Sequence, residues 1–350
     1  IYTLSLHDAL PILMDFGGDE IYLKEFPSLA GKTYGELLNL FNKNCLMGIK
    51  SPGNPAQLNP SMDTVLTAQD QLILVAEDDD KIFVDGKGSI MNDLIRNEKN
   101  PPAKPEKTLL MGWNWKAPSI MRELDNYVPK GSTLTVMAEG QNLEEEIKEV
   151  SGELKNEKVL FQPGDITDRR KLEALQLDIY DHIILLCYSD DLEVQKADAR
   201  TMITLLHLRD IAEKKNQDFS IVSEMLDIRN RNLAEVSQAD DFIVSDKLIS
   251  LMMAQVSENK SLNSVFQDIF DPEGSEIYLR PIGSYVEPGK AVNFYTVIES
   301  ARKKNETAIG YRLNADARNA ALSYGVHLNP DKSEKVIFTP NDKVIVLGNE

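Results

Sequence analysis

The chain has 350 residues, of which 42% are hydrophobic and 27% are charged, and its formal net charge is −18. These proportions describe a globular protein that is long enough for two or three domains. The negative charge excludes a protein that binds nucleic acid through its phosphates, because that binding needs clustered lysine and arginine. It also disfavours adsorption to an anionic membrane surface, whereas it is compatible with bound cations, including divalent metals.

The two cysteines, Cys45 and Cys187, lie far apart in apolar segments. They can form neither a disulfide framework nor a zinc site, which favours a reducing cytoplasmic setting. The sequence has no apolar run of the roughly 18 residues that a transmembrane helix needs.

Residues 1–12 are expected to be a non-native tail, because they resemble translated sequencing adaptor and have no counterpart in the repeat described below. On this interpretation the natural protein continues upstream. Residues 13–82 form a first small module, with strands predicted at 21–23, 47–50 and 71–75 and a helix at 33–41.

The acidic run Asp78-Asp79-Asp80 ends the first module. It lacks the glycine and the closing glutamate of a calcium loop, so we interpret it as a solvated turn. Residues 83–106 contain Asp-Gly-Lys-Gly and Pro-Pro-Ala-Lys-Pro, which is the composition of a semi-rigid linker.

Strands and helices alternate through residues 107–245. Strands are predicted at 108–111, 134–138, 159–161, 182–187, 220–223 and 242–244, and helices at 116–127, 143–154, 168–175 and 192–214. This alternation predicts an α/β fold with a doubly wound, parallel, Rossmann-like sheet.

Residues 246–271 contain two helices, separated by a break at 259–261. The first is apolar around much of its circumference, which is typical of a helix that packs between two bodies, and methionine suits an adaptable contact. We interpret the pair as crossover helices that mediate dimerisation; packing within one domain is the alternative. The candidate interface residues are Leu248, Leu251, Met252, Met253, Val256 and Phe266.

Residues 272–350 repeat the first module. Gly18–Lys24 (GDEIYLK) matches Gly274–Arg280 (GSEIYLR), and the Leu-Asn-Pro sequence at 58–60 recurs at 328–330. The apolar strand after Asp70 likewise recurs after Asp342. The repeat predicts a second small α+β module, and duplication around a Rossmann-like core is typical of a regulatory array, since one catalytic site needs only one such module.

Candidate ligand-binding residues follow the strands of the central sheet. The turn after its first strand, Gly112–Ala117 (GWNWKA), keeps only the first glycine of the Gly-x-Gly-x-x-Gly dinucleotide pattern. Its two tryptophans would obstruct a pyrophosphate, which disfavours NAD as a cofactor. Because the carboxyl ends of parallel strands meet at one edge, the candidates are Gly112, Trp113, Asn114, Glu139, Asp165, Ser189, Asp190, Glu224 and Asp227.

Several of these candidates are carboxylates, which could together coordinate calcium. The alternative for Ser189 and Asp190 is helix capping. No catalytic arrangement is apparent, because His182 begins a strand and His207 lies among leucines on a helix, where packing or a surface position explains both. The chain also lacks a phosphate-binding Gly-x-x-x-x-Gly-Lys-Ser/Thr loop, so we do not expect an enzyme.

These motifs resemble the CASTOR/POLLUX ion-channel family, whose cytoplasmic parts contain RCK domains (regulators of potassium conductance) with TrkA-N-like and TrkA-C-like regions. The resemblance is carried by Gly112-Trp113, Ala197–Arg200 (ADAR), Ile221–Asp227 (IVSEMLD), Arg231–Leu233 (RNL) and Glu273–Pro281 (EGSEIYLRP).

The resemblance implies a gating region at the cytoplasmic face of a membrane, below a tetrameric cation pore to which each subunit contributes two RCK units. Residues 13–82 would then be the C-terminal module of a first unit, residues 107–350 the second unit, and the pore would lie upstream. Family members use calcium as a gating ligand, and the implied partners are other subunits. Two alternatives stay open: a soluble TrkA-like regulator of potassium uptake, and an NAD(P)-dependent oxidoreductase.

Overall fold

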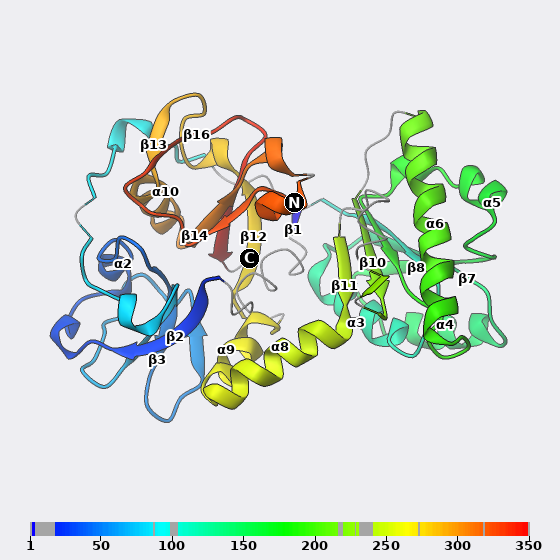
Figure 1. Ribbon diagram of the computed structural model, residues 1–350, viewed down its shortest axis with the longest axis horizontal. Coiled ribbons are helices and arrows are strands. Elements are labelled where there is room, and N and C mark those ends of the chain that lie inside the picture. The colour runs from blue at the N-terminus through cyan, green and yellow to red at the C-terminus, as the bar shows by residue number, and fades with distance from the viewer. Residues whose placement is uncertain are drawn as a thin grey trace. The chain divides into compact units, whose positions relative to one another are not determined.

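The computed structural model describes residues 2–3, 18–86, 88–98, 104–215, 220–227, 229–230, 241–271, 274–317 and 319–348. The chain divides into two compact units (Figure 1). We call Ala103–Ser250 the Rossmann-like unit, and Ile1–Pro102 together with Leu251–Glu350 the paired-module unit. Of the motifs that carry the family resemblance, residues 231–233 and 273 lie outside the described part of the chain.

The Rossmann-like unit is built on a six-stranded parallel sheet in the order β11-β10-β9-β6-β7-β8. The strands are β6 (Lys107–Met111), β7 (Ser132–Ala138), β8 (Glu157–Pro163), β9 (His182–Leu185), β10 (Ser220–Met225) and β11 (Asp241–Val244). This is the strand order of dinucleotide-binding folds, in which the direction of winding reverses between the first and fourth strands, here β6 and β9. The predicted doubly wound sheet is confirmed.

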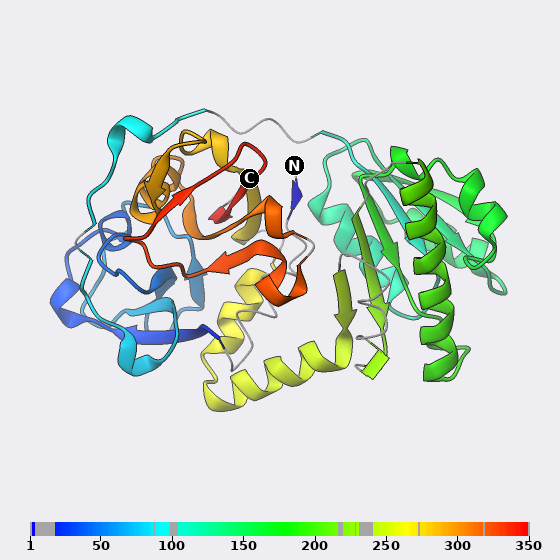
Figure 2. The ribbon, with the colours of Figure 1, turned by 45° about the horizontal axis from the view of Figure 1, so that its top comes forward.

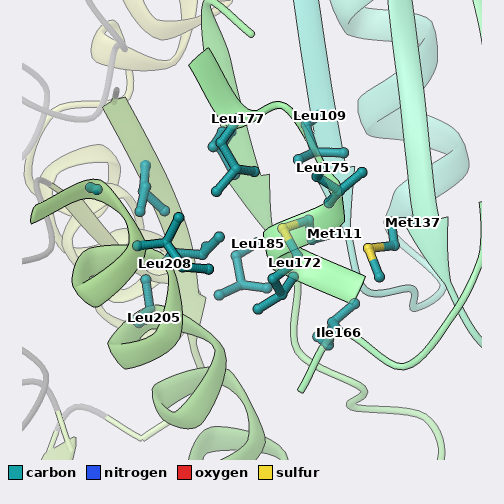
Figure 3. Packing of buried hydrophobic residues seen from close by; sticks show 14 of the residues in the cluster. Leu109, Met111, Met137, Ile166, Leu172, Leu175, Leu177, Leu185, Leu205 and Leu208 are labelled. Carbon is teal, nitrogen blue, oxygen red and sulfur yellow. The ribbon is translucent and has the colours of Figure 1, made fainter. Parts of the chain in front are cut away.

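Helices cover both faces of this sheet. They are α3 (Ala117–Tyr127), α4 (Leu143–Ser151), α5 (Arg169–Ala174) and α6 (Val194–Lys215). Leu109 and Met111 of β6 belong to one buried cluster with Leu208 of α6, which Figure 3 shows. Leu110, between them, belongs to the opposite cluster with Met121 of α3. Both faces are therefore buried, which explains why the strands are continuous apolar runs in the sequence.

The paired-module unit contains two sheets with the same strand order. The first module has the order β2-β5-β3-β4, and the second has β12-β17-β14-β15 with β1 added beside β12. The strands are β1 (Tyr2–Thr3), β2 (Glu20–Glu25), β3 (Cys45–Lys50), β4 (Ala56–Leu58), β5 (Gln71–Ala76), β12 (Glu276–Pro281), β14 (Thr307–Arg312), β15 (Val326–Leu328) and β17 (Lys343–Gly348), with a separate pair β13 (Ala291–Asn293) and β16 (Lys335–Ile337). The helices are α2 (Tyr34–Leu37), α8 (Ser245–Glu258, which extends from the Rossmann-like unit), α9 (Leu262–Ile269) and α10 (Phe294–Arg302). The predicted repeat matches corresponding strands, β2 with β12 and β5 with β17.

The repeat extends to local backbone geometry. The pairing of β3 with β5 and of β14 with β17 shifts register just before Gly48 and Gly310, respectively. A Cβ at Gly48 would lie 2.3 Å from the Gln57 carbonyl oxygen, and one at Gly310 would lie 2.4 Å from that of His327. Both positions therefore require glycine, because the neighbouring strand approaches too closely for a side chain.

The two modules pack against each other, side by side in Figures 1 and 2, and two of their contacts are reciprocal. The Asn59 side-chain amide donates to the Asn305 carbonyl at 3.0 Å, and Asn329 donates to the Lys43 carbonyl at 2.9 Å. These residues occupy corresponding positions, since Asn59 and Asn329 follow β4 and β15 and Lys43 and Asn305 precede β3 and β14. Each module thus makes the same contact with the other.

One part of this interface has lost its symmetry. Thr307 donates its hydroxyl proton to Asn59 Oδ1 at 2.8 Å and lies 3.0 Å from the Tyr34 hydroxyl. The corresponding residues on the other side are Cys45, Asn329 and Phe294. There the buried Asn329 Oδ1 has no hydrogen-bond partner among the described residues.

Part of the segment predicted to be a linker is packed against the second module. This part is residues 88–98, which we call the strap. Asn293 donates to the Ser89 carbonyl at 2.9 Å, the Arg96 amide donates to the Tyr285 carbonyl at 2.8 Å, and the Glu287 amide donates to the Leu94 carbonyl at 3.0 Å. The strap thereby joins the second module through its backbone. These bonds involve main-chain atoms of the strap, so they cannot be recognised from its composition. Composition alone therefore predicted a spacer.

The tail expected to be non-native lies mostly outside the described residues. Residues 2–3 form β1, in which Tyr2 pairs with Leu279 and Thr3 with Tyr278 of β12. The helix expected at 33–41 is shorter than predicted, because α2 ends at Leu37 while Leu38 and Phe41 are buried beyond its end. Apolar spacing there reflects burial rather than a continuous helix.

Candidate functional site

The candidate site lies at the carboxyl edge of the Rossmann-like sheet, at the ends of the paired strands β6 and β9. Gly112 has a φ of +83°, and a Cβ at this position would lie 2.3 Å from the Leu186 carbonyl oxygen. Its role is therefore to let the ends of the two strands approach. Trp113 packs partly buried against both core clusters, whereas Trp115 is 68% exposed.

The turn after β6 is held by side chains of the protein itself. Asn114, which is 1% exposed, donates to the Cys187 carbonyl at 2.7 Å and to Glu224 Oε2 at 2.8 Å. The Lys116 amide donates to Asn114 Oδ1 at 3.0 Å, and the Trp115 amide donates to Asp190 Oδ2 at 2.7 Å. In dinucleotide folds the amides at this helix start bind the pyrophosphate. That NAD is not a cofactor stays a prediction, and these bonds support it.

Glu224, at the end of β10, joins three other segments of this edge. Its side chain is 6% exposed. Oε1 lies 2.5 Å from Lys116 Nζ, and Oε2 accepts hydrogen bonds from Asn114 and from the Cys187 amide, the latter at 3.1 Å. The carboxylate is thus a buried, multiply bonded centre rather than an open ligand group.

Glu139 and Asp165 lie on either side of Arg200 from α6. Arg200 Nη2 donates to both carboxylates, at 2.8 Å in the case of Asp165. The guanidinium also lies 4.4 Å from the centre of the Tyr188 ring, and the Tyr188 hydroxyl accepts from the Glu139 amide at 3.1 Å. Burial would raise the pKa of Asp165, but hydrogen bonds from Thr167 and the charge of Arg200 outweigh that effect and lower it.

Asp227 lies farther along the edge and pairs with Arg229 at 2.6 Å. Hydrogen bonds from the Arg229 side chain and backbone lower the pKa of Asp227 to about 2. Ser189 donates to Asp190 Oδ1 at 3.1 Å. The capping alternative for Asp190 is supported in altered form, because Asp190 accepts the Trp115 amide beside the start of α3.

The nine candidates therefore lie along one edge but in separate clusters. Asn114 and Glu224 meet through Lys116, Glu139 and Asp165 meet through Arg200, and Ser189 meets Asp190. Each of these carboxylates already has a basic or amide partner. Among the described residues, the one acidic group with metal-like spacing is Asp78, Asp79 and Asp80 in the other unit. All three are exposed and Asp78 Oδ1 accepts the Asp79 amide at 2.6 Å, which agrees with a solvated turn.

Lys116, Asp198 and Arg200 lie in the quoted motifs but were not among the candidate site residues. Asp198 is 1% exposed and accepts the amides of Leu226 at 2.9 Å and Asp227 at 3.0 Å, so it fixes the segment after β10. Its position among the buried residues of α6, with Ala197 and Leu205, was the available signal, since a charged residue on a buried face needs specific partners.

The candidate interface residues differ in exposure. Met253 of α8 is 69% exposed, and Leu251, Met252 and Val256 are half-buried. Phe266 is 3% exposed, because α9 packs on β4 of the first module, where Asp268 accepts the Leu58 amide at 2.7 Å. Phe266 thus follows the alternative of packing within the chain, and the side chain of Leu248 lies outside the described part.

No described helix is both long enough and apolar enough to span a bilayer.

Comparison with known proteins relates the chain to ion channels. A family model described as Castor and Pollux, part of voltage-gated ion channel, matches residues 6–91. The chain is 30% identical to the "Probable ion channel POLLUX" of Arabidopsis thaliana, over 96% of this chain and 44% of the relative. It is 29% identical to the protein of the same name from Oryza sativa subsp. japonica, over 96% of this chain and 38% of the relative. The predicted resemblance is confirmed, and the chain spans about two-fifths of these relatives.

The structure of the human SLO3 gating ring has a similar fold. It aligns with a TM-score of 0.70 and 12% identity, covering 97% of this chain and 68% of the other. At this identity the similarity concerns the fold. It agrees with the predicted combination of a Rossmann-like domain and two small flanking modules.

Proposed function

This chain is a relative of the CASTOR and POLLUX ion channels, and we propose that it is the cytoplasmic gating region of such a channel. The observation that carries the proposal is the match to channel relatives over 96% of the chain, supported by the gating-ring fold. In this role the chain changes conformation without catalysing a reaction, and it passes that change to a pore in the rest of a longer protein. A ligand achieves this only by binding one conformation more tightly than another.

Subunit contact through α8 is the first part of the proposal. Ile249 and Met253 are 55% and 69% exposed and lie four residues apart, on one side of the helix. We expect Met253→Glu to shift the purified chain from dimer to monomer, because a carboxylate in an apolar contact must be desolvated without a partner. Sedimentation velocity at increasing concentration measures the shift.

The matched control is Ile337→Glu, which places the same charge at an apolar residue that is 64% exposed in the second module. It should leave the dimer intact. A wild-type chain that remains monomeric at every concentration, with and without calcium, contradicts the proposed contact.

Calcium is the proposed ligand. The geometry of the carboxyl edge limits how the ion can bind there. Calcium needs several oxygen ligands that face one point. Between Glu139 and Asp165 that position is taken by the Arg200 guanidinium, so the described arrangement does not fit the ion. Binding at this edge therefore requires Arg200 to leave both carboxylates.

Arg200→Gln is expected to increase the affinity of the chain for calcium, because it removes the competing cation and keeps Glu139 and Asp165. Isothermal titration calorimetry with calcium chloride measures the change. Arg170→Gln is the control, since the Arg170 side chain is 90% exposed and pairs only with Asp168 among the described acidic residues. Equal affinity in wild type and Arg200→Gln would remove calcium from this edge and leave the gating proposal untouched.

The oxidoreductase and TrkA-like alternatives are separated by a ligand screen. Thermal-shift measurements with NAD, NADH, ADP and calcium distinguish a nucleotide site from a cation site. Stabilisation by NADH would favour a dinucleotide site at the β6 turn, and stabilisation by calcium alone would favour a cation site. A longer chain with a membrane pore would separate a channel from a soluble TrkA-like subunit.

A further inference from the structure

A buried acidic pair lies at the amino edge of the Rossmann-like sheet, opposite to the candidate ligand edge. Glu157 is the first residue of β8, pairs with Ser132 of β7 and is 8% exposed. Its Oε1 is buried and has no hydrogen-bond partner among the described residues. Burial of a carboxylate oxygen without a hydrogen-bond donor disfavours the ionised form of the group.

The second member of the pair is Asp125, near the end of α3, which is 5% exposed. Its carboxylate accepts three backbone amides, from Lys155 at 2.8 Å, from Asn156 at 2.7 Å and from Glu157 at 2.9 Å. These bonds hold the Asp125 carboxylate beside the first residues of β8. At this position the Asp125 carboxylate disfavours a negative charge on Glu157.

Among the described residues, no basic side chain compensates the charge of Glu157. From α3 the titratable group that acts on it is Asp125. The Ser132 hydroxyl of β7 is already engaged, since it donates to the Pro129 carbonyl at 2.7 Å and accepts from the Glu106 amide at 2.9 Å. Burial, followed by the charge of Asp125, raises the pKa of Glu157 to about 7.

We propose that Glu157 is a proton-operated switch, which in its neutral form keeps the corner between α3 and β8 closed and in its ionised form loosens it. The corner is the segment of residues 155–157 that Asp125 binds. The proposal is independent of the gating role.

The direction of the pH effect follows from the raised pKa. Between the ordinary glutamate value and about 7, the folded chain binds a proton that the unfolded chain has released. Stability is therefore fully present below the ordinary value and falls as the pH rises to about 7, above which the loss is constant. From pH 6 to pH 8 the neutral fraction of Glu157 falls about tenfold.

The test measures hydrogen exchange of the amides of residues 155–157. Exchange is itself catalysed by base, so the rates are expressed as protection factors, which correct for the intrinsic rate at each pH. In the wild-type chain we expect protection to fall about tenfold from pH 6 to pH 8, in proportion to the neutral fraction. Glu157→Gln, a neutral side chain of the same size, should show constant protection. Glu145→Gln, on the exposed side of α4, should behave as the wild type.

A second measurement keeps the proposal falsifiable if Glu157→Gln does not fold. A carbon-13 NMR titration of the wild-type glutamate carboxyls should contain one resonance whose midpoint lies near neutrality. The protection of the corner amides should change over the same pH range. A Glu157 resonance that titrates near the ordinary glutamate value overturns the proposal, as does a pH-dependent loss of protection that persists in Glu157→Gln.

Discussion

Replacement of Glu224 by alanine should lower the free energy of unfolding of the Rossmann-like unit by about 4 kcal/mol. The change leaves the buried Cys187 amide without its side-chain acceptor and deprives Asn114 of one of its two acceptors. It also removes the carboxylate from Lys116, whose side chain is 26% exposed. Because breaking one member of a buried charged pair costs more than the pair itself contributes, this single change should have the largest effect at the edge.

Tryptophan fluorescence is the appropriate measurement for Glu224→Ala. The only two tryptophans of the sequence, Trp113 and Trp115, lie in the turn that Glu224 holds. Urea unfolding should therefore shift to a lower midpoint in fluorescence. Glu213→Ala, at an exposed position of α6, is the control and should leave the midpoint unchanged. A loss for Glu224→Ala below about 1 kcal/mol, the scale of a surface ion pair, would contradict a buried anchoring role.

Replacement of Lys332 by alanine should destabilise the paired-module unit by about 3 kcal/mol. Lys332 is 0% exposed, and its Nζ donates to the Asn44 carbonyl at 2.7 Å and to the Leu38 carbonyl at 3.2 Å, both in the first module. Burial lowers the pKa of Lys332. The alanine leaves two carbonyl groups without these donors and also leaves a cavity.

Lys332→Met separates these two contributions. Met62 stands at the corresponding place in the first module, two residues after the repeated Leu-Asn-Pro sequence, and is 8% exposed. Methionine fills the space of the lysine stem, so Lys332→Met should lose less stability than Lys332→Ala, by about 2 kcal/mol. Circular dichroism is needed, because this unit contains no tryptophan. Equal losses in both variants would show that packing of the stem contributes nothing.

The strands and the duplicated module were predictable because burial on both faces leaves a continuous apolar run and because the repeat is visible in the residues themselves. The end of α2 was not predictable. Leu38 and Phe41 keep helical spacing although the helix stops at Leu37, since buried positions in an irregular segment can have the same spacing. The strap was missed for a different reason: its backbone hydrogen bonds leave no trace in composition.

The candidate edge was located by sheet topology, because strand ends in a parallel sheet share one side. The partners of its carboxylates were not predictable. Arg200 lies 61 residues from Glu139 and 35 from Asp165, so local sequence does not relate them. Glu157 appeared to be only the start of a strand, and its unusual state depends on Asp125, which lies 32 residues earlier.

The lost symmetry between the two modules bears on the history of this protein. Two identical copies that bind through a two-fold axis must accept every substitution twice, once in each half of the contact. After fusion into one polypeptide, each half can vary alone. The Tyr34–Thr307–Asn59 side has a complete set of polar partners, while the Phe294–Cys45–Asn329 side does not. A self-associating ancestor, doubled within one gene, would leave this signature.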